Sequence, residues 1–262
     1  MDESLIKSGL NNPDFFRFHL FDSIDSTNNF LLDLGKQDQP GWSVVAADVQ
    51  TAGKGRLNRH WESPRDKGLL FSILLRPQVE PSFSNLINLL SAACLADFLE
   101  EEIISQTNQK IKVDLKWPND LLIKGKKVAG ILLQSNLIAG ELQFVVVGIG
   151  LNVNHDIADF SGDIKKTATS FKIETHLFWI REKILAGFLN QFYASYEKYF
   201  PTGGEEILKL YLNKVIHLGE KVKVNQVGNE ISGVFNGLSP EGYMLLKQND
   251  EIKIISNGEI VS

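Results

Sequence analysis

Hydrophobic and polar positions follow one pattern before Leu218 and another after it. In the first part, short apolar runs alternate with longer stretches whose apolar residues recur about every 3.6 positions, the helical period. The runs predict strands at 15–24, 42–49, 68–75, 121–123, 128–133 and 143–151. The longer stretches predict helices over 82–102, 177–200 and 205–215. In the 177–200 helix, the residues expected on the buried side are Ile180, Ile184, Phe188 and Phe192.

After Leu218 the period shortens to strict alternation with tight turns, which is typical of small β-structures. Strands are expected at 221–224, 231–238, 243–246 and 252–255. We therefore predict two domains, 1–214 and 215–262, the second a small β-barrel. A unit this short buries little core, so it is expected to pack against the larger domain.

The residues Asp25, Ser26, Thr27 and Asn28 precede the short apolar stretch 30–34, which predicts a helix that ends at Gly35. Asp25 or Ser26 has the side chain of a helix N-cap. Alternatively, the hydroxyls and amide of Ser26, Thr27 and Asn28 offer hydrogen bonds to a neutral polar ligand such as a ureido group. The residues alone leave both interpretations open.

The segment 50–61 joins two predicted strands and is the richest in unusual chemistry. Two glycines allow close backbone approach to a ligand, and three cations and a flat ring accompany them; the residues are Gly53, Lys54, Gly55, Arg56, Arg59 and Trp61. The set suits an anion with an aromatic part, whereas a basic surface hairpin is the simpler alternative. The segment has neither the Gly-Lys-Ser/Thr of a P-loop nor the third glycine of a Rossmann motif.

A second group of polar residues lies around the predicted hairpin of 121–123 and 128–133. Asn119 and Asp120 follow Trp117-Pro118, so four residues combine an aromatic ring, a fixed φ, an amide and a carboxylate. A simple connecting loop does not require this combination. Lys127 adjoins an apolar strand, where a cation needs an anionic partner. Further along, Asn152 is open between turn and site residue, Asn154 is expected in a turn, and 155–166 is expected to be a surface loop.

Composition narrows the class of protein. The formal net charge is −5 and the pI is about 5.6, which argues against non-specific nucleic-acid binding. Cys94 is the single cysteine and falls on the apolar side of a predicted helix, so it is expected in the core. A lone cysteine and the lack of an export signal or a long apolar span predict a cytoplasmic protein without a membrane segment.

Taken together, these segments resemble biotin protein ligases. The motifs that carry the resemblance are Asp25-Ser-Thr-Asn28, Gly53-Lys-Gly-Arg56, Lys116-Trp-Pro-Asn-Asp120, Lys127-Val-Ala-Gly-Ile131 and Gly148-Ile-Gly-Leu-Asn152. The resemblance implies an α+β fold: a class II aminoacyl-tRNA synthetase-like catalytic domain of mixed β-sheet and helices, followed by a small SH3-like barrel. The family loop usually reads Gly-Arg-Gly-Arg, so Lys54 replaces an arginine fork by a point charge. Because the catalytic pattern begins by about residue 15, an N-terminal DNA-binding domain is not expected.

The resemblance also implies roles for individual residues. The biotin-binding set is Ser26, Thr27, Asn28, Gln50, Lys54, Gly55, Arg56 and Lys127. The set for ATP and the adenylate is Gly53, Lys54, Arg56, Arg59, Trp61, Lys116, Asn119, Lys127 and Asn152, with Trp61 against the adenine. The catalytic set is Lys127, Asp120 and Arg56. Lys127 is expected to bind the biotin carboxylate and the α-phosphate, and Asp120 to orient or deprotonate the acceptor amine.

The implied reaction uses ATP with Mg²⁺ to convert biotin into biotinyl-5′-AMP and then acylates a lysine of a biotin carboxyl carrier domain. Mg²⁺ is expected to arrive with ATP, without a dedicated protein site. Residues 51–60 are expected to be a mobile lid that orders over the adenylate. The family is compatible with a homodimer. Two alternatives are a lipoate protein ligase and, from another class, a non-catalytic biotinyl-adenylate sensor or repressor.

Overall fold

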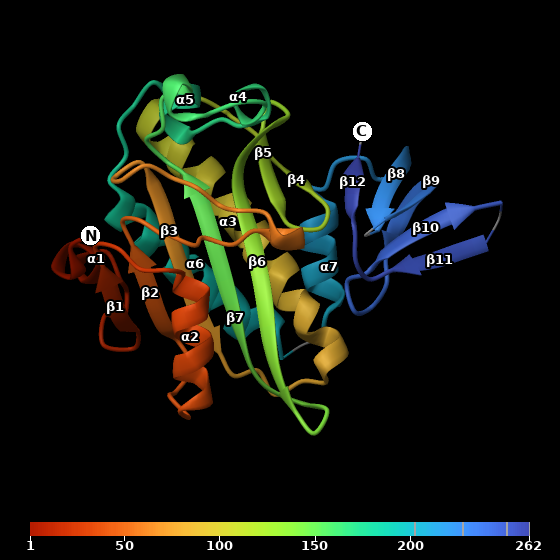
Figure 1. The fold of residues 1–262 in the computed structure, drawn as a ribbon, viewed down its shortest axis with the longest axis horizontal. Coiled ribbons are helices and arrows are strands. Elements are labelled where there is room, and N and C mark those ends of the chain that lie inside the picture. Colours follow the sequence, from red (N-terminus) through yellow and green to blue (C-terminus); the bar gives the residue numbers. More distant parts are fainter. Residues whose placement is uncertain (202, 227, 250, 262) are drawn as a thin grey trace.

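The computed structural model describes residues 1–201, 203–226, 228–249 and 251–261. The larger part of the chain is built on a seven-stranded mixed sheet (Figure 1). Across the sheet the order is β1 (Arg17–Phe21), β2 (Ser43–Ala47), β3 (Gly68–Leu75), β7 (Glu141–Asn152), β6 (Lys126–Ile138), β5 (Asp120–Ile123) and β4 (Val113–Lys116). Only the β1–β2 pair is parallel within this sheet. Every strand expected here is present, which confirms the α+β class.

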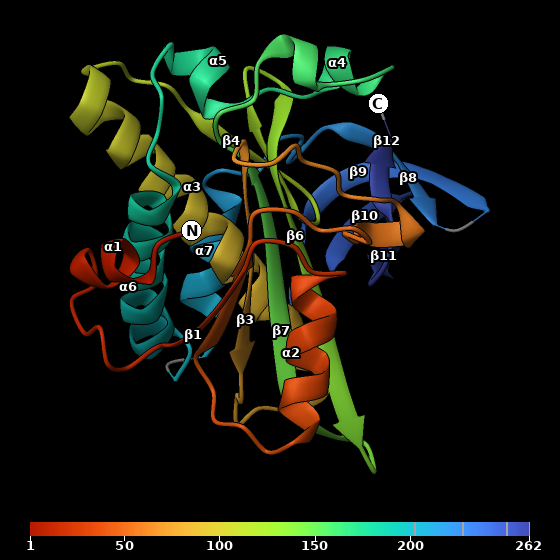
Figure 2. The same ribbon diagram turned by 60° about the vertical axis from the view of Figure 1, so that its left-hand side comes forward.

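Helices cover both faces of this sheet, as Figure 2 shows. On one face lies α2 (Thr27–Lys36), over the buried cluster of Leu31, Val45, Leu74, Phe144 and Val146. On the other lie α3 (Asn85–Thr107) and α6 (Arg181–Tyr199), with α1 (Glu3–Ser8) and α7 (Glu205–Leu212) packed against them. The side chains of successive residues in each central strand therefore point alternately into the core under α2 and into the core under α3 and α6.

The segment Pro81–Thr107, which contains α3 and the preceding 3₁₀ turn η2 (Pro81–Ser84), is long and apolar enough to cross a bilayer by length and composition. However, 72% of its most apolar window is buried inside the fold. Its apolar surface contacts other helices and the sheet, so the segment is a core helix of this domain. Cys94 lies within it and is buried, as expected.

The structure corrects two expectations about the segment 155–200, the first only in part, since residues 161–167 are exposed. Residues 155–166 are not simply a surface loop, because His155 is buried and the segment contains η3 (Ile157–Asp159) and the start of α4 (Ile164–Thr167). The predicted helix starts at Arg181 instead of residue 177, and Ile180 is 42% exposed. The short helix α5 (Phe171–Thr175) ends at the left-handed His176, and Asn154 accepts a hydrogen bond from the Trp179 amide, so the backbone before Arg181 is held extended.

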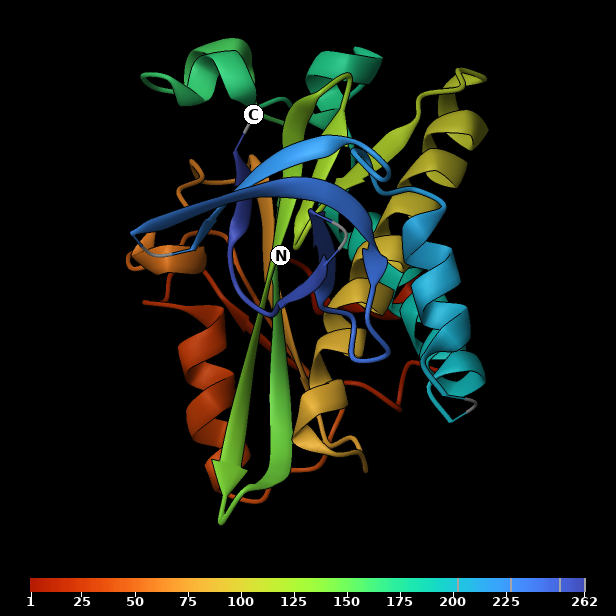
Figure 3. The same ribbon diagram turned by 90° about the vertical axis from the view of Figure 1, so that its right-hand side faces the viewer.

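The C-terminal residues form a separate five-stranded antiparallel sheet (Figure 3). Its order is β11 (Glu251–Ile255), β10 (Met244–Gln248), β9 (Asn229–Leu238), β8 (Lys221–Gln226) and β12 (Glu259–Val261). Four of these strands match the alternating pattern, and β12 was not expected. Asn85 on α3 donates a hydrogen bond to the carbonyl of Gly242 at 3.0 Å, which confirms that the small domain packs against the large one.

Candidate active site

Three glycines on neighbouring strands form a flat floor on the α2 side of the large sheet. Gly150 pairs with Gly130, and Gly148 pairs with Ser72 and Leu132. A Cβ on Gly150 would lie 2.4 Å from the Trp61 ring, and one on Gly148 would lie 2.0 Å from the Asn28 amide oxygen. Only glycine leaves room for these side chains to lie on the backbone. At Gly148 and Gly150 the groups that approach the backbone are the side chains of Asn28 and Trp61.

Above this floor lies a cavity of about 800 Å³. It is lined by fourteen of the fifteen site residues that the sequence suggested: Ser26, Thr27, Asn28, Gln50, Lys54, Gly55, Arg56, Arg59, Trp61, Lys116, Asn119, Asp120, Lys127 and Asn152. The exception is Gly53, which is buried and accepts a hydrogen bond from the Trp61 amide at 3.0 Å. Gly53 therefore closes the base of the loop instead of facing the cavity.

One end of the cavity is neutral and polar, and the start of α2 forms it. Ser26 is the N-cap of this helix and accepts a long hydrogen bond from the Asn29 amide, so the capping interpretation is confirmed and the residue also lines the cavity. The backbone amide and the hydroxyl of Thr27 donate to Gln50 Oε1 at 2.7 and 3.0 Å. Asn28 is buried beside them. This end can satisfy several hydrogen bonds of an uncharged head group.

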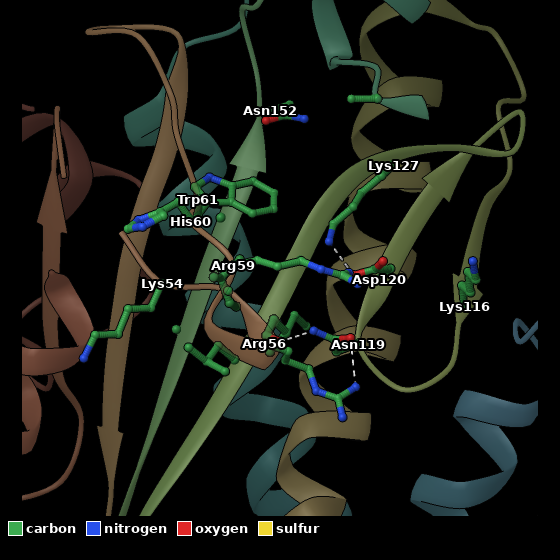
Figure 4. A pocket seen from close by; sticks show the side chains of 18 of the residues that line it. Lys54, Arg56, Arg59, His60, Trp61, Lys116, Asn119, Asp120, Lys127 and Asn152 are labelled. Atoms are coloured by element: carbon green, nitrogen blue, oxygen red, sulfur yellow. Dashed lines mark hydrogen bonds and ion pairs between the residues drawn. The ribbon is translucent and has the colours of Figure 1, made fainter. Parts of the chain in front are cut away.

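The other end carries an ion pair. Lys127 Nζ lies 2.6 Å from Asp120 Oδ1 and 5.3 Å from the centre of the Trp61 ring (Figure 4). Both side chains of the pair are about one-third exposed, so they face the opening. Asp120 is the anionic partner that the sequence required for Lys127. Because the cation is only partly desolvated, an incoming anion can compete for it.

The cations of the basic loop are each bonded to other protein groups. Lys54 donates to Asn29 Oδ1 at 2.8 Å and extends away from the Lys127–Asp120 pair in Figure 4. Arg56 donates to Asn119 Oδ1 and to Asn257 Oδ1, at 3.4 and 3.0 Å. Burial lowers the pKa of Arg56, and the charge of Asp120 works against that shift. In this structure the ammonium of Lys54 is therefore held by Asn29 on the first turn of α2.

Arg59 forms a double hydrogen bond and ion pair with Glu259, 200 residues away on β12. This contact raises the pKa of Arg59. Glu259, Ile260 and Val261 all line the cavity, so the small domain forms part of its wall. The sequence did not predict this contribution, since nothing in the local pattern connects residue 59 with residue 259.

The remaining amides hold neighbouring backbone. Asn119 Nδ2 donates to the Ile131 carbonyl at 2.7 Å, and Asn152 Nδ2 donates to the Thr169 carbonyl at 3.1 Å. Asn154 lies in a bend just after β7, and it is buried and bonds both polar backbone groups of Trp179. Lys116 lies on the far side of the cavity from the labelled loop residues (Figure 4).

Cys94 has no part in this site. Burial raises the pKa of its thiol to about 12, so it is not a nucleophile at neutral pH. Two residues that bond to Asn28 from outside the cavity lining, Ser72 and Gln134, were missed by the sequence analysis. For Ser72 a signal existed, because it is the single polar residue in an apolar strand.

Comparison with known proteins agrees with this geometry. Residues 20–152 match the model of the "Biotin/lipoate A/B protein ligase family", and residues 217–261 match the "Biotin protein ligase C terminal domain". These two matches define the class as the biotin and lipoate protein ligases and place a biotin-ligase C-terminal domain after the catalytic one.

Individual relatives narrow the class. The chain is 31% identical to the bifunctional ligase/repressor BirA of Bacillus subtilis over 99% of this chain and 78% of that protein. It is 30% identical to the biotin–[acetyl-CoA-carboxylase] ligase of Paracoccus denitrificans over 90% and 96% of the two chains. The solved biotin protein ligase of Aquifex aeolicus in complex with biotin and ATP superposes with a TM-score of 0.77, at 31% identity over 94% and 97% of the chains. The chain belongs to the biotin protein ligase family.

Proposed function

We propose that this protein activates biotin with MgATP to give biotinyl-5′-AMP and then transfers the biotinyl group to a lysine of a biotin carboxyl carrier domain. The observation that carries the proposal is that one cavity has a neutral polar end at Thr27 and Asn28 and a charged end at Lys127 and Asp120. Biotin has the same polarity, with a neutral bicyclic head and an anionic tail. The Aquifex structure, which is in complex with biotin and ATP, and the name of the Paracoccus relative, biotin–[acetyl-CoA-carboxylase] ligase, support the same function.

The first step joins two anions. A carboxylate oxygen of biotin attacks the α-phosphorus of ATP, the bond to the β-phosphate oxygen breaks, and pyrophosphate leaves. Like charges oppose this approach, and the ammonium of Lys127 offsets them by bonding the carboxylate and the α-phosphate. Arg56 and Arg59 add positive charge from the loop, and Mg²⁺ is carried by the triphosphate oxygens that it prefers.

The same step releases a base. When Lys127 bonds the ligand anions, its contact with Asp120 weakens, and the carboxylate becomes available at the same place. In the second step the acceptor amine attacks the carbonyl carbon of biotinyl-5′-AMP. The bond to the phosphate oxygen breaks, AMP leaves, and the amine proton passes to Asp120. When Lys127 exchanges Asp120 for the ligand anions, it therefore assists adenylate formation and also frees Asp120 for the transfer step.

The loop 51–60 has the composition and position of a lid. An acyl-adenylate hydrolyses readily, so the site must exclude water until the carrier docks. In this structure Arg56 and Arg59 tie the loop to the small domain through Asn257 and Glu259. We propose that the loop exchanges part of these contacts for the nucleotide when both substrates bind. The single buried cysteine is compatible with a cytoplasmic site of action.

A lipoate ligase is the nearest alternative, because one of the matching family models covers both activities. The match of residues 217–261 to a biotin ligase domain favours biotin. Titration calorimetry with biotin and with lipoate distinguishes the two. The sensor or repressor alternative draws on the bifunctional Bacillus relative, and a mobility-shift assay on operator-like DNA tests it.

The proposal is tested with the purified protein, biotin, MgATP and a carboxylase carrier domain. Intact-mass measurement is expected to show one biotinyl group added to the carrier, and none without ATP. A carrier variant with its acceptor lysine replaced by arginine is the control. An unmodified carrier in the complete mixture would refute the proposed function.

A further inference from the structure

Ser72 is an isolated polar residue in the centre of a buried apolar strand. It is the single polar side chain of β3 and is fully buried. It does not line the cavity. Its hydroxyl oxygen lies 2.6 Å from Asn28 Oδ1 and 2.7 Å from Thr27 Oγ1. Both residues that its hydroxyl contacts, Thr27 and Asn28, line the cavity.

The opposite edge of the Asn28 amide is held from β6. Asn28 Nδ2 donates to Gln134 Oε1 at 2.8 Å and to the Leu132 carbonyl at 3.3 Å. Both partners are acceptors, so they fix which end of the amide is nitrogen. The amide lies flat on Gly148, where a Cβ would come within 2.0 Å of its oxygen. Asn28 is thereby clamped between two strands and a glycine floor.

The count of protons then determines what Asn28 can offer to a ligand. Its two amide protons are both used by Gln134 and Leu132. The hydroxyl of Ser72 lies within donor distance of both Asn28 Oδ1 and Thr27 Oγ1, and Asn28 Oδ1, which can only accept, has room for a further donor. Asn28 therefore presents an acceptor and no donor to the cavity. Without Ser72 and Gln134, the side-chain amide of Asn28 could rotate by about 180° and present its NH₂ group, a donor, to the cavity.

We propose that Ser72 and Gln134 are positioning residues that keep the Asn28 amide an acceptor, so that the polar end of the cavity selects head groups with N–H donors. This inference rests on the proposed function and specifies how its site chooses a substrate. A cyclic urea has two N–H groups, whereas a dithiolane has none. Selection follows because an N–H of a cyclic urea can donate to the open lone pair of Asn28 Oδ1, a hydrogen bond that a dithiolane cannot make.

The first test replaces Gln134. Gln134→Leu removes the acceptor from β6, Gln134→Glu keeps it, and Asn136→Leu is a control two residues along the same face of the strand. By calorimetry we expect Gln134→Leu to raise the Kd for biotin about tenfold, the size of one lost hydrogen bond. Binding of lipoate, the dithiolane probe, should not change. Gln134→Glu and Asn136→Leu should bind biotin within about twofold of the parent protein.

The second test asks whether both residues act through one amide. Ser72→Ala should also weaken biotin binding, and the double variant Ser72→Ala/Gln134→Leu should lose less than the two single losses combined, because both release the same group. In steady state, KM for biotin should rise while KM for MgATP stays unchanged. Equal rises in both constants, or additive losses in the double variant, would overturn the inference in favour of a general loosening of the fold.

A measurement without ligand separates the inference from the proposed function. In the apo protein, the side-chain amide protons of Asn28 should exchange slowly by NMR and should exchange faster in Gln134→Leu but not in Asn136→Leu. Fast exchange in the parent protein would show that no clamp exists. If the parent protein shows protected amide protons yet binds no biotin, the proposed function fails and the clamp of Asn28 stands.

Discussion

Lys127 and Asp120 form an ion pair 2.6 Å long between adjacent strands of one hairpin, at the charged end of the cavity. The sequence assigned them separate roles, and the structure places them in contact. Each group therefore controls when the other is available.

Replacing Lys127 should abolish the first step while leaving the fold intact. A contact between unit charges at 4 Å is worth about 4 kcal/mol at an effective dielectric near 20, and about 1.4 kcal/mol corresponds to a factor of ten. We expect Lys127→Ala to slow adenylate formation by about a thousandfold, measured by single-turnover assay. Lys126→Ala, an exposed neighbour on the same hairpin, is the control. Near-normal turnover of Lys127→Ala would remove this residue from catalysis.

Replacing Asp120 should affect the second step more than the first. Asp120→Asn keeps the shape of the side chain and loses its basicity. With preformed biotinyl-5′-AMP, we expect transfer to the carrier to slow about a hundredfold or more, the usual range for loss of a general base. Asp163→Asn, at an exposed position before α4, should transfer normally. Full-rate transfer by Asp120→Asn would mean that another group accepts the amine proton.

The ion pair of Arg59 with Glu259 should restrain the loop in the apo protein. The Arg59 side chain is 64% exposed, so the pair is expected to contribute at most about 1 kcal/mol. In Glu259→Gln, we therefore expect cleavage by trypsin in residues 51–60 to speed up about two- to fivefold without ligands. With biotin and ATP both present, the two proteins should be equally protected. Cleavage unaffected by the substrates would rule out the lid.

His155 should make stability depend on pH. Its ring stacks on Phe160, its Nε2 lies 3.1 Å from Ser63 Oγ, and burial lowers its pKa to about 4. In the unfolded chain the pKa of histidine is about 6.5. The unfolded state therefore takes up a proton first, and stability present above pH 6.5 is lost as the pH falls toward 4.

At about 1.36 kcal/mol per pKa unit, lowering the pH from about 7 to about 4.5 should cost on the order of 2 to 3 kcal/mol through this residue. The measurement is urea unfolding of the parent protein and of His155→Phe across that range. The difference between the two free energies of unfolding should shift by this amount in favour of the variant at low pH. If the free energies of unfolding of the parent protein and of His155→Phe change with pH in the same way, His155 has the same pKa in the folded and the unfolded protein, which would contradict the prediction.

The sequence predicted most strands and the long helices because their patterns are local. The strand 68–75 is apolar throughout and lies between two other strands, as such a run requires. The predicted start of the 177–200 helix lies before the observed start at Arg181. An apolar residue just before a helix cannot be told from the apolar face of the helix by spacing alone. Ile180 is the N-cap, and tertiary contacts of Asn154 with Trp179 decide the boundary.

The site was predictable where chemistry is concentrated in short motifs and unpredictable where it depends on distant contacts. Lys127 stood out because a cation beside an apolar strand needs a partner, and Asp120 is that partner. Glu259 could not be found, since its neighbour Arg59 is 200 residues away. Gln134 comes just after the strand predicted at 128–133, and its contact with Asn28 arises only because β6 continues to Ile138 and lies beside the start of α2 in the fold.

The central claim is that the positive groups around the charged end of the cavity allow a carboxylate to attack the α-phosphate of ATP. The most direct measurement is exchange of labelled pyrophosphate into ATP by the purified protein. We predict exchange that requires biotin, that needs no carrier domain, and that is lost in Lys127→Ala. Absence of biotin-dependent exchange in the parent protein, with all reagents supplied, would contradict the account.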